Sequence, residues 1–150
     1  MANKIKASLF LKQKTSTRVS FLSITSSRTI LGDGVSAALP GYHAFTGCDS
    51  VSAFAGRGKK AGLQLLKSDP RYQNLFVKLG ERWEVNDELF EKLEKFTYQM
   101  YDKKTKCTNV NDLRFELFVK RKGKIESQQL PPCKDCLRKH CLRANYQAGI

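Results

Sequence analysis

The stretch LPGYHAFTGCDSVSAFAGRGKKAGLQLLK, residues 39–67, decides how this chain is organised. It contains an aromatic segment that stops at Gly47, a polar turn with Asp49, and a Gly-x-Gly step at residues 56–58 that leads into an apolar helix. Glycine is frequent just beyond the end of a helix, where the backbone often turns left-handed. The sequence therefore predicts a helix–hairpin–helix element over about residues 40–67.

Three features of this segment suit chemistry at a phosphodiester. A carboxylate on a turn, here that of Asp49, can bind a hard cation such as Mg²⁺ through its oxygen atoms. A Gly-x-Gly step lets backbone N–H groups approach a phosphate, and the following helix N-terminus adds a favourable dipole. Asp49 is thus the candidate catalytic and metal-binding residue. The candidate nucleic-acid-binding residues are Gly56, Arg57, Gly58, Lys59 and Lys60.

The overall charge favours a partner that carries phosphate. The 150 residues hold 27 Lys and Arg against 14 Asp and Glu, a net charge of +13 at pH 7. A basic domain most often binds nucleic acid, with an anionic membrane surface as the second choice. Hydrophobic residues make up 41% of the chain, which is enough for one packed core and too many for a disordered basic tail. No apolar run has the length of a membrane span, so no membrane partner is expected.

The cysteines indicate a reducing environment. Five cysteines cannot all pair within one chain, and no secretory signal precedes them, so we expect reduced thiols and an intracellular protein, nuclear or cytoplasmic. Four residues near the C-terminus resemble a zinc cluster: Cys133, Cys136, His140 and Cys141. On one helix Cys133 and His140 would be separated by about 10 Å along the axis, whereas the ligands of tetrahedral zinc lie within about 4 Å of one another. We therefore expect these side chains to pack in the core rather than to bind zinc, the alternative being two of them completed by Cys107 or His43.

Hydrophobic periodicity predicts a mainly α-helical fold with a small N-terminal β-hairpin. Alternation over residues 4–12 indicates a half-buried strand, and a second strand begins at Val19 after a polar turn at residues 13–17. Residues 110–120 fit either a helix or a strand. The predicted helices cover residues 25–31, 40–46, 59–67, 70–79, 87–100 and 131–147.

Several single residues have predicted local roles. Pro40 suits the first turn of its helix, where a missing N–H costs nothing. Asp69 and Asn86 suit helix caps, and Asp33 lies in a Gly-Asp-Gly turn. The aromatic residues, Trp83 among them, could stack on bases, but most fall on helical stripes and are expected in the core.

The order Gly47-x-Asp49, six residues, then Gly56-x-Gly58-x-Lys60 and an apolar helix resembles the flap endonuclease (PIN-like) nucleases. In that family an aspartate on this turn is an active-site metal ligand. The helix–hairpin–helix that follows grips the phosphate backbone of duplex DNA, with help from a monovalent cation. The resemblance implies that Asp49 is a Mg²⁺ ligand and that Gly56, Gly58 and Lys60 form the DNA-gripping hairpin.

A second resemblance covers almost the whole chain. Several segments are similar to uncharacterised animal proteins derived from mobile elements, namely residues 39–54, 111–118, 130–132 and 143–147. Longer members of that family have an upstream strand with an Asp-x-Asp pair, another part of the nuclease metal site. The resemblance implies that residues 1–80 are the C-terminal part of an α/β PIN-like nuclease domain, and that residues 81–150 are a helical extension.

The small number of carboxylates in the first half of the chain argues against hydrolytic activity of this chain alone. Two-metal hydrolysis needs several carboxylates around ions about 4 Å apart, and besides Asp49 the first half of the chain offers only Asp33 and Asp69. We therefore expect the nucleic-acid-binding C-terminal portion of a metal-dependent, structure-specific nuclease-like protein, inactive alone, with an incomplete Mg²⁺ site and duplex or branched DNA as its partner. The alternatives are a non-catalytic DNA-binding module and a truncated mobile-element relic. The sequence does not choose between DNA and RNA or fix the oligomeric state.

Overall fold

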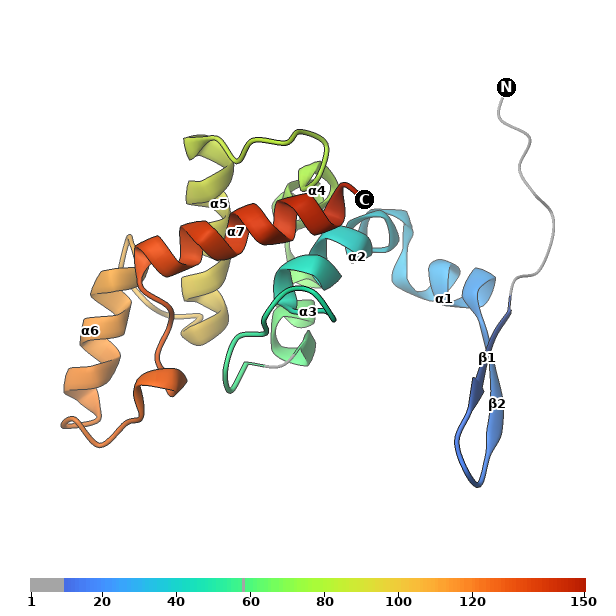
Figure 1. The fold of residues 1–150 in the computed structure, drawn as a ribbon, viewed down its shortest axis with the longest axis horizontal. Helices are drawn as coiled ribbons and strands as arrows, with labels where there is room; N and C mark the ends of the chain where they lie inside the picture. Colours follow the sequence, from blue (N-terminus) through green and yellow to red (C-terminus); the bar gives the residue numbers. More distant parts are fainter. Residues whose placement is uncertain (1–9, 58) are drawn as a thin grey trace.

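The computed structural model describes residues 10–57 and 59–150 (Figure 1). This part of the chain contains two short strands and seven α-helices. The predicted fold class, mainly α with a small N-terminal hairpin, is confirmed. In chain order the elements are β1 (Phe10–Lys14), β2 (Val19–Ser23), α1 (Ile24–Leu31), α2 (Asp33–Thr46), α3 (Lys59–Ser68), α4 (Pro70–Lys78), α5 (Asp87–Tyr101), α6 (Val110–Lys120), the 3-10 turn η1 (Ser127–Gln129) and α7 (Lys134–Ala148).

The hairpin differs from its prediction in turn and burial. β1 continues to Lys14, which pairs with Val19, so the turn spans Thr15–Arg18 and is closed by the Thr15 N–H donating to the Arg18 carbonyl at 2.8 Å. Every residue of β1 is exposed, so the predicted half-buried strand is wrong for this part. The reason is tertiary, because in the part of the chain that the structure describes the hairpin contacts the short helix α1 and no larger sheet covers either face. The predicted strand residues 4–9 lie outside the described residues.

Helix α2 begins earlier than the sequence indicates. It starts at Asp33, so Pro40 lies in its interior and not in its first turn, which corrects the prediction. An interior proline removes one backbone hydrogen bond, but burial of Tyr42, Phe45 and the rest of this face offsets that loss. Asp33 is the first helical residue rather than part of a turn, and its carboxylate accepts from Arg28 Nε at 2.8 Å.

The core lies where α2 packs against α4 and α7, with α5 closing it (Figure 1). Its centre is aromatic, and the rings of Phe76 and Phe96 meet edge to face at 4.8 Å between centroids. Phe45 contacts both of them. One cluster of buried side chains includes Phe45 and Leu137, so the segments on the two sides of residue 80 share this core.

Two predicted helix caps are confirmed. Asn86 caps α5 by accepting from the Leu89 N–H at 2.9 Å, and Asp69 caps α4, both as predicted. Residues 110–120, open between helix and strand, form α6. The last helix begins at Lys134, a little later than predicted, with Cys133 as its N-cap residue.

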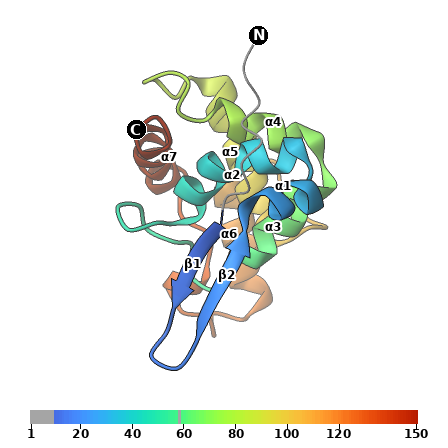
Figure 2. The ribbon, with the colours of Figure 1, turned by 90° about the vertical axis from the view of Figure 1, so that its right-hand side faces the viewer.

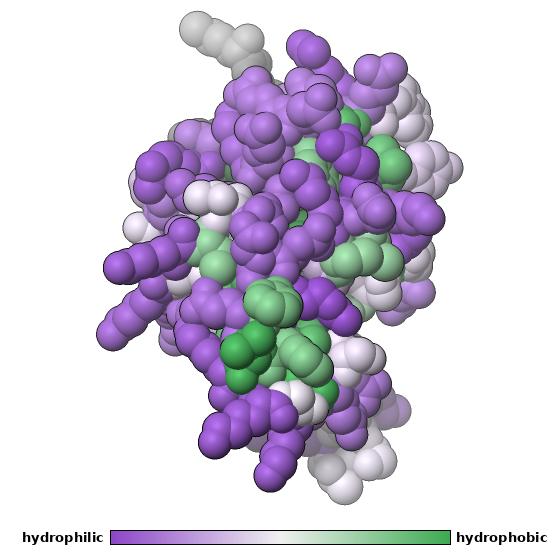
Figure 3. Space-filling view, turned by 90° about the vertical axis from the view of Figure 1, so that its left-hand side faces the viewer, coloured by the Kyte–Doolittle hydropathy of each residue, from purple (hydrophilic) through white to green (hydrophobic). Residues whose placement is uncertain are grey.

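Some aromatic residues lie at the surface. Trp83 is 75% exposed on the loop before α5 and rests against the ring of Tyr146, so its predicted place in the core is wrong. Phe115 and Phe118 of α6 are also exposed, and Figure 3 shows hydrophobic side chains gathered on the side of the molecule where α6 lies. Within the described ranges, no helix combines the length and the apolar character needed to cross a membrane.

Candidate nucleic-acid interface

The loop of residues 47–58 joins α2 to α3 and carries most of the predicted site. It leaves α2 at Gly47, whose φ of 110° is strained for any other residue. A Cβ there would also lie 2.7 Å from the Cα of Ala53, so the close approach requires glycine. The Cys48 N–H then donates to the Val51 carbonyl at 2.9 Å, which closes the turn that displays the next residue.

Asp49 is exposed in this turn. The neighbouring Ser50 hydroxyl donates to Gln147 Oε1, which fastens the turn to the C-terminal end of α7. Among the residues that the structure describes, no three His, Cys, Asp or Glu side chains lie close enough together to hold a metal ion. Among the described residues Asp49 therefore belongs to no cluster of three potential metal ligands, and its assignment to Mg²⁺ stays a prediction.

Arg57, near the other end of the loop, has a structural role that the sequence did not indicate. Its Nη2 donates to the Tyr101 carbonyl at 3.1 Å, and its guanidinium carbon lies 5.1 Å from the centroid of the Tyr101 ring. Burial raises the pKa of Tyr101, although the nearby charge of Arg57 lowers it in part. Arg57 thus anchors the loop to the end of α5 and leaves only part of its guanidinium for a ligand.

Of the two glycines of the predicted hairpin, Gly56 is among the described residues. Gly56 has φ +66° with open space where a Cβ would stand, so the backbone conformation rather than crowding favours glycine. Gly58 lies outside the described residues, and its predicted role stays a prediction. Gly56 is exposed, so its backbone can be approached from solvent.

The start of α3 is held by two side chains of α2. The Tyr42 hydroxyl donates to the Lys59 carbonyl, and burial raises the pKa of Tyr42 to about 12, which keeps the hydroxyl a donor. Lys59 Nζ lies 2.5 Å from His43 Nδ1. Lys60 is exposed and points to no carboxylate among the described residues. The helix N-terminus and two lysines are therefore presented together.

The segment that forms this positive end contains no acidic residue. Between Asp49 and Asp69 the sequence contains four basic residues and no Asp or Glu. The N-terminal end of a helix carries a partial positive charge, which attracts anions. We call this region the α3 basic surface, made up of Arg57, Lys59 and Lys60.

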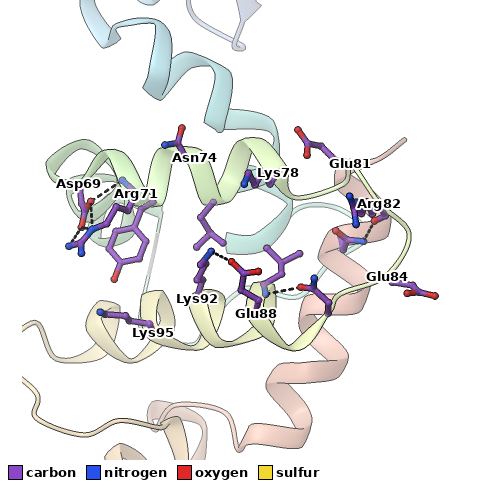
Figure 4. Close-up of a pocket in the computed structure, with 15 residues that line it drawn as sticks. Asp69, Arg71, Asn74, Lys78, Glu81, Arg82, Glu84, Glu88, Lys92 and Lys95 are labelled. Carbon is purple, nitrogen blue, oxygen red and sulfur yellow. Dashed lines mark hydrogen bonds and ion pairs between the residues drawn. The ribbon is translucent and has the colours of Figure 1, made fainter.

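A cleft between α4 and α5, which the sequence did not indicate, offers a contrast (Figure 4). Its volume is about 690 Å³, and it is lined by side chains of both signs. Arg71 is paired with Asp69 at 2.8 Å and Lys92 with Glu88 at 2.5 Å. Arg71 also holds the pKa of Asp69 below its ordinary value through hydrogen bonds. The cleft therefore lacks the excess of positive charge that binding of a polyphosphate backbone requires.

The cysteine and histidine cluster lies along α7, and only half of it packs in the core as predicted. His140 and Cys141 are buried, whereas Cys133, the N-cap residue, is half-buried and Cys136, in the first turn, is exposed, so the predicted packing is wrong for Cys136. Burial lowers the pKa of His140 and raises that of Cys141 to about 12. The two buried side chains serve packing against the core.

The structure thus gathers only part of the predicted site. Arg57, Lys59 and Lys60 lie at the N-terminal end of α3, whereas the turn that carries Asp49 is fastened to α7 through Ser50 at the opposite end of the loop. Comparison with protein-family models, with curated proteins and with solved structures yields no match, so function has to be inferred from the contacts and charges of the chain itself.

Proposed function

We propose that this chain is a nucleic-acid-binding module, the C-terminal portion of a metal-dependent, structure-specific nuclease-like protein, without hydrolytic activity of its own. The observation that carries the proposal is the α3 basic surface, where lysines stand at a helix N-terminus in a stretch without acidic residues. The partner is DNA, duplex or branched.

Phosphate binding follows from the electrostatics of this surface. Each lysine that neutralises a phosphate releases a condensed counterion, so affinity falls as salt concentration rises. Lys60 has no described ion-pair partner, and the only described contact of the Lys59 ammonium is the His43 imidazole. Both charges are therefore available to a ligand without first breaking a salt bridge.

Asp49 can supply only one part of a metal site. In a nuclease-like protein it would supply one oxygen ligand to Mg²⁺, and the remaining ligands would come from carboxylates outside this set of residues. A single exposed carboxylate does not hold two metal ions. The alternative, a purely non-catalytic module, differs in giving Asp49 no role at all.

The test is fluorescence anisotropy with labelled DNA duplexes, linear and branched, over a series of salt concentrations. We expect the double variant Lys59→Gln, Lys60→Gln to lose about tenfold in affinity at low salt and to reduce the salt slope by about two. The matched control is Lys92→Gln, Lys95→Gln, which removes the same charge from the mixed cleft and should bind like the unmodified chain. Binding that ignores salt, or that ignores the α3 replacements, contradicts the proposal.

Cleavage assays test the second part of the proposal, that the chain has no hydrolytic activity of its own. The isolated chain with Mg²⁺ should leave every substrate intact, and Asp49→Asn should leave binding unchanged. Cleavage by the unmodified chain that Asp49→Asn abolishes would instead show a complete nuclease.

A further inference from the structure

We propose that one face of the β1–β2 hairpin binds single-stranded nucleic acid by stacking bases on Phe10 and Phe21. The inference rests on the proposed function in one respect, that the partner is nucleic acid. It concerns a different surface and names a different substrate, an unpaired strand.

The register of the hairpin places both rings on the same face. Phe10 pairs with Ser23 and Lys12 pairs with Phe21, and side chains of a strand alternate between faces. Phe10 and Phe21 are therefore diagonal neighbours, roughly 7–8 Å apart. This face carries Phe10, Lys12, Lys14, Val19, Phe21 and Ser23.

Both rings are open to solvent. Phe10 is 59% exposed and Phe21 is 66% exposed, and the hairpin projects from the helical body (Figures 1 and 2). Exposed aromatic rings on a sheet are the arrangement by which several single-strand-binding domains stack two or three bases. Stacking tolerates any sequence because every base has a π-face.

The positive charge of this region favours nucleic acid as the ligand. Residues 1–32 contain six basic residues and no Asp or Glu. On the hairpin, Lys12, Lys14 and Arg18 form no ion pair with any described residue. Lysines interleaved with rings suit the phosphates between stacked bases, whereas a second copy of the hairpin would bring like charges together.

The opposite face provides an internal control. It carries Leu11, Gln13, Ser20 and Leu22, with neither an aromatic ring nor a charge. Leu11 and Leu22 are exposed to a similar degree as the two phenylalanines. If binding were a general hydrophobic contact, or if the substitutions disturbed folding, replacing the leucines would weaken binding as much as replacing the phenylalanines. Base stacking depends only on the face that carries Phe10 and Phe21.

The experiment measures binding of a labelled oligothymidine to the full chain. We expect Phe10→Ala, Phe21→Ala to weaken binding roughly 10- to 100-fold, and Leu11→Ala, Leu22→Ala to retain the affinity of the unmodified chain. Phe21→Trp in a Trp83→Phe background should keep the affinity and show fluorescence quenching when the oligonucleotide stacks.

Three results overturn the inference. These are an unchanged affinity in the phenylalanine variant, an equal loss in the leucine variant, or a concentration-dependent dimer in sedimentation that needs the two rings. If duplex binding still depends on Lys59 and Lys60 while the phenylalanine variant has no effect, only the hairpin inference fails. If no nucleic acid binds at low salt, the proposed function fails with it.

Discussion

His140 Nε2 lies 2.7 Å from the carbonyl oxygen of Phe45, a hydrogen bond that joins positions 95 residues apart. The neutral imidazole donates this bond, while the ring packs edge to face on Phe54 at 4.7 Å between centroids. The last helix, α7, is thereby fixed to the end of α2 and to the loop that displays Asp49. The position of the candidate site thus depends on a residue far from it in sequence.

This bond makes stability depend on pH. Burial lowers the pKa of His140 below its ordinary value of about 6.5, so on acidification the unfolded chain takes up a proton before the folded chain does. Stability is then complete above about pH 6.5 and falls as the pH drops below it. Urea unfolding at neutral and mildly acidic pH should show this loss. His140→Gln should remove this part of the pH dependence, whereas His43→Gln, on the exposed face of α2, should retain it; equal slopes in both variants would contradict the assignment.

Two glycines of α2 should respond oppositely to alanine. A Cβ at Gly41 would lie 2.2 Å from the Phe76 carbonyl oxygen, which belongs to the backbone of α4 and cannot move away alone. Gly41→Ala should destabilise the fold by about 2 kcal/mol despite a better helix propensity. At Gly34 the added atom meets only the flexible end of Gln73, so Gly34→Ala should be neutral or gain about 0.5 kcal/mol. Chemical denaturation of both variants checks the difference, and similar effects would show that α2 and α4 are not in close contact.

Asn145 holds the loop before α5 to α7. Its Oδ1 accepts from the Gly80 N–H at 2.9 Å, and its Nδ2 donates to the Arg82 carbonyl at 2.6 Å. Asn145→Asp keeps the acceptor but turns a carboxylate toward a carbonyl, which should cost about 2–3 kcal/mol of unfolding free energy. Asn74→Asp, an exposed change of the same kind, should stay within about 0.5 kcal/mol. Equal thermal stability of the two variants would argue against the contact.

The thiols should react in a fixed order. Hydrogen bonds from the backbone and thiol of Cys136 lower the pKa of Cys133, whereas burial raises that of Cys141 to about 12. Since the thiolate is the reactive form, iodoacetamide should alkylate Cys133 quickly and Cys141 only on unfolding. Cys133→Ser should accelerate alkylation of Cys136, because the neighbouring thiol raises the pKa of Cys136. Mass spectrometry of the labelled peptides measures the order, and early labelling of Cys141 would refute it.

Local features of the fold were predictable because their causes are local. The caps at Asn86 and Asp69 depend on a side chain and a backbone N–H two or three residues away. The bounds around Pro40 were wrong because the helix is stabilised by buried residues that face α4, a partner outside any short window. Trp83 was wrongly placed for the same reason, since its surroundings are set by α7.

The candidate site likewise has features that follow from the local sequence and features that depend on distant contacts. The sequence by itself determined the element types outside residues 110–120, the excess of positive charge, and the acid-free stretch that holds Lys59 and Lys60, since charge and periodicity do not depend on distant contacts. Only the tertiary structure decided that Arg57 anchors to Tyr101, that the turn with Asp49 is fastened to α7, and that the hairpin leaves its rings uncovered. The physical reason is that a cation or a ring is available to a ligand only if no other part of the folded chain uses it, and those partners lie far away in sequence.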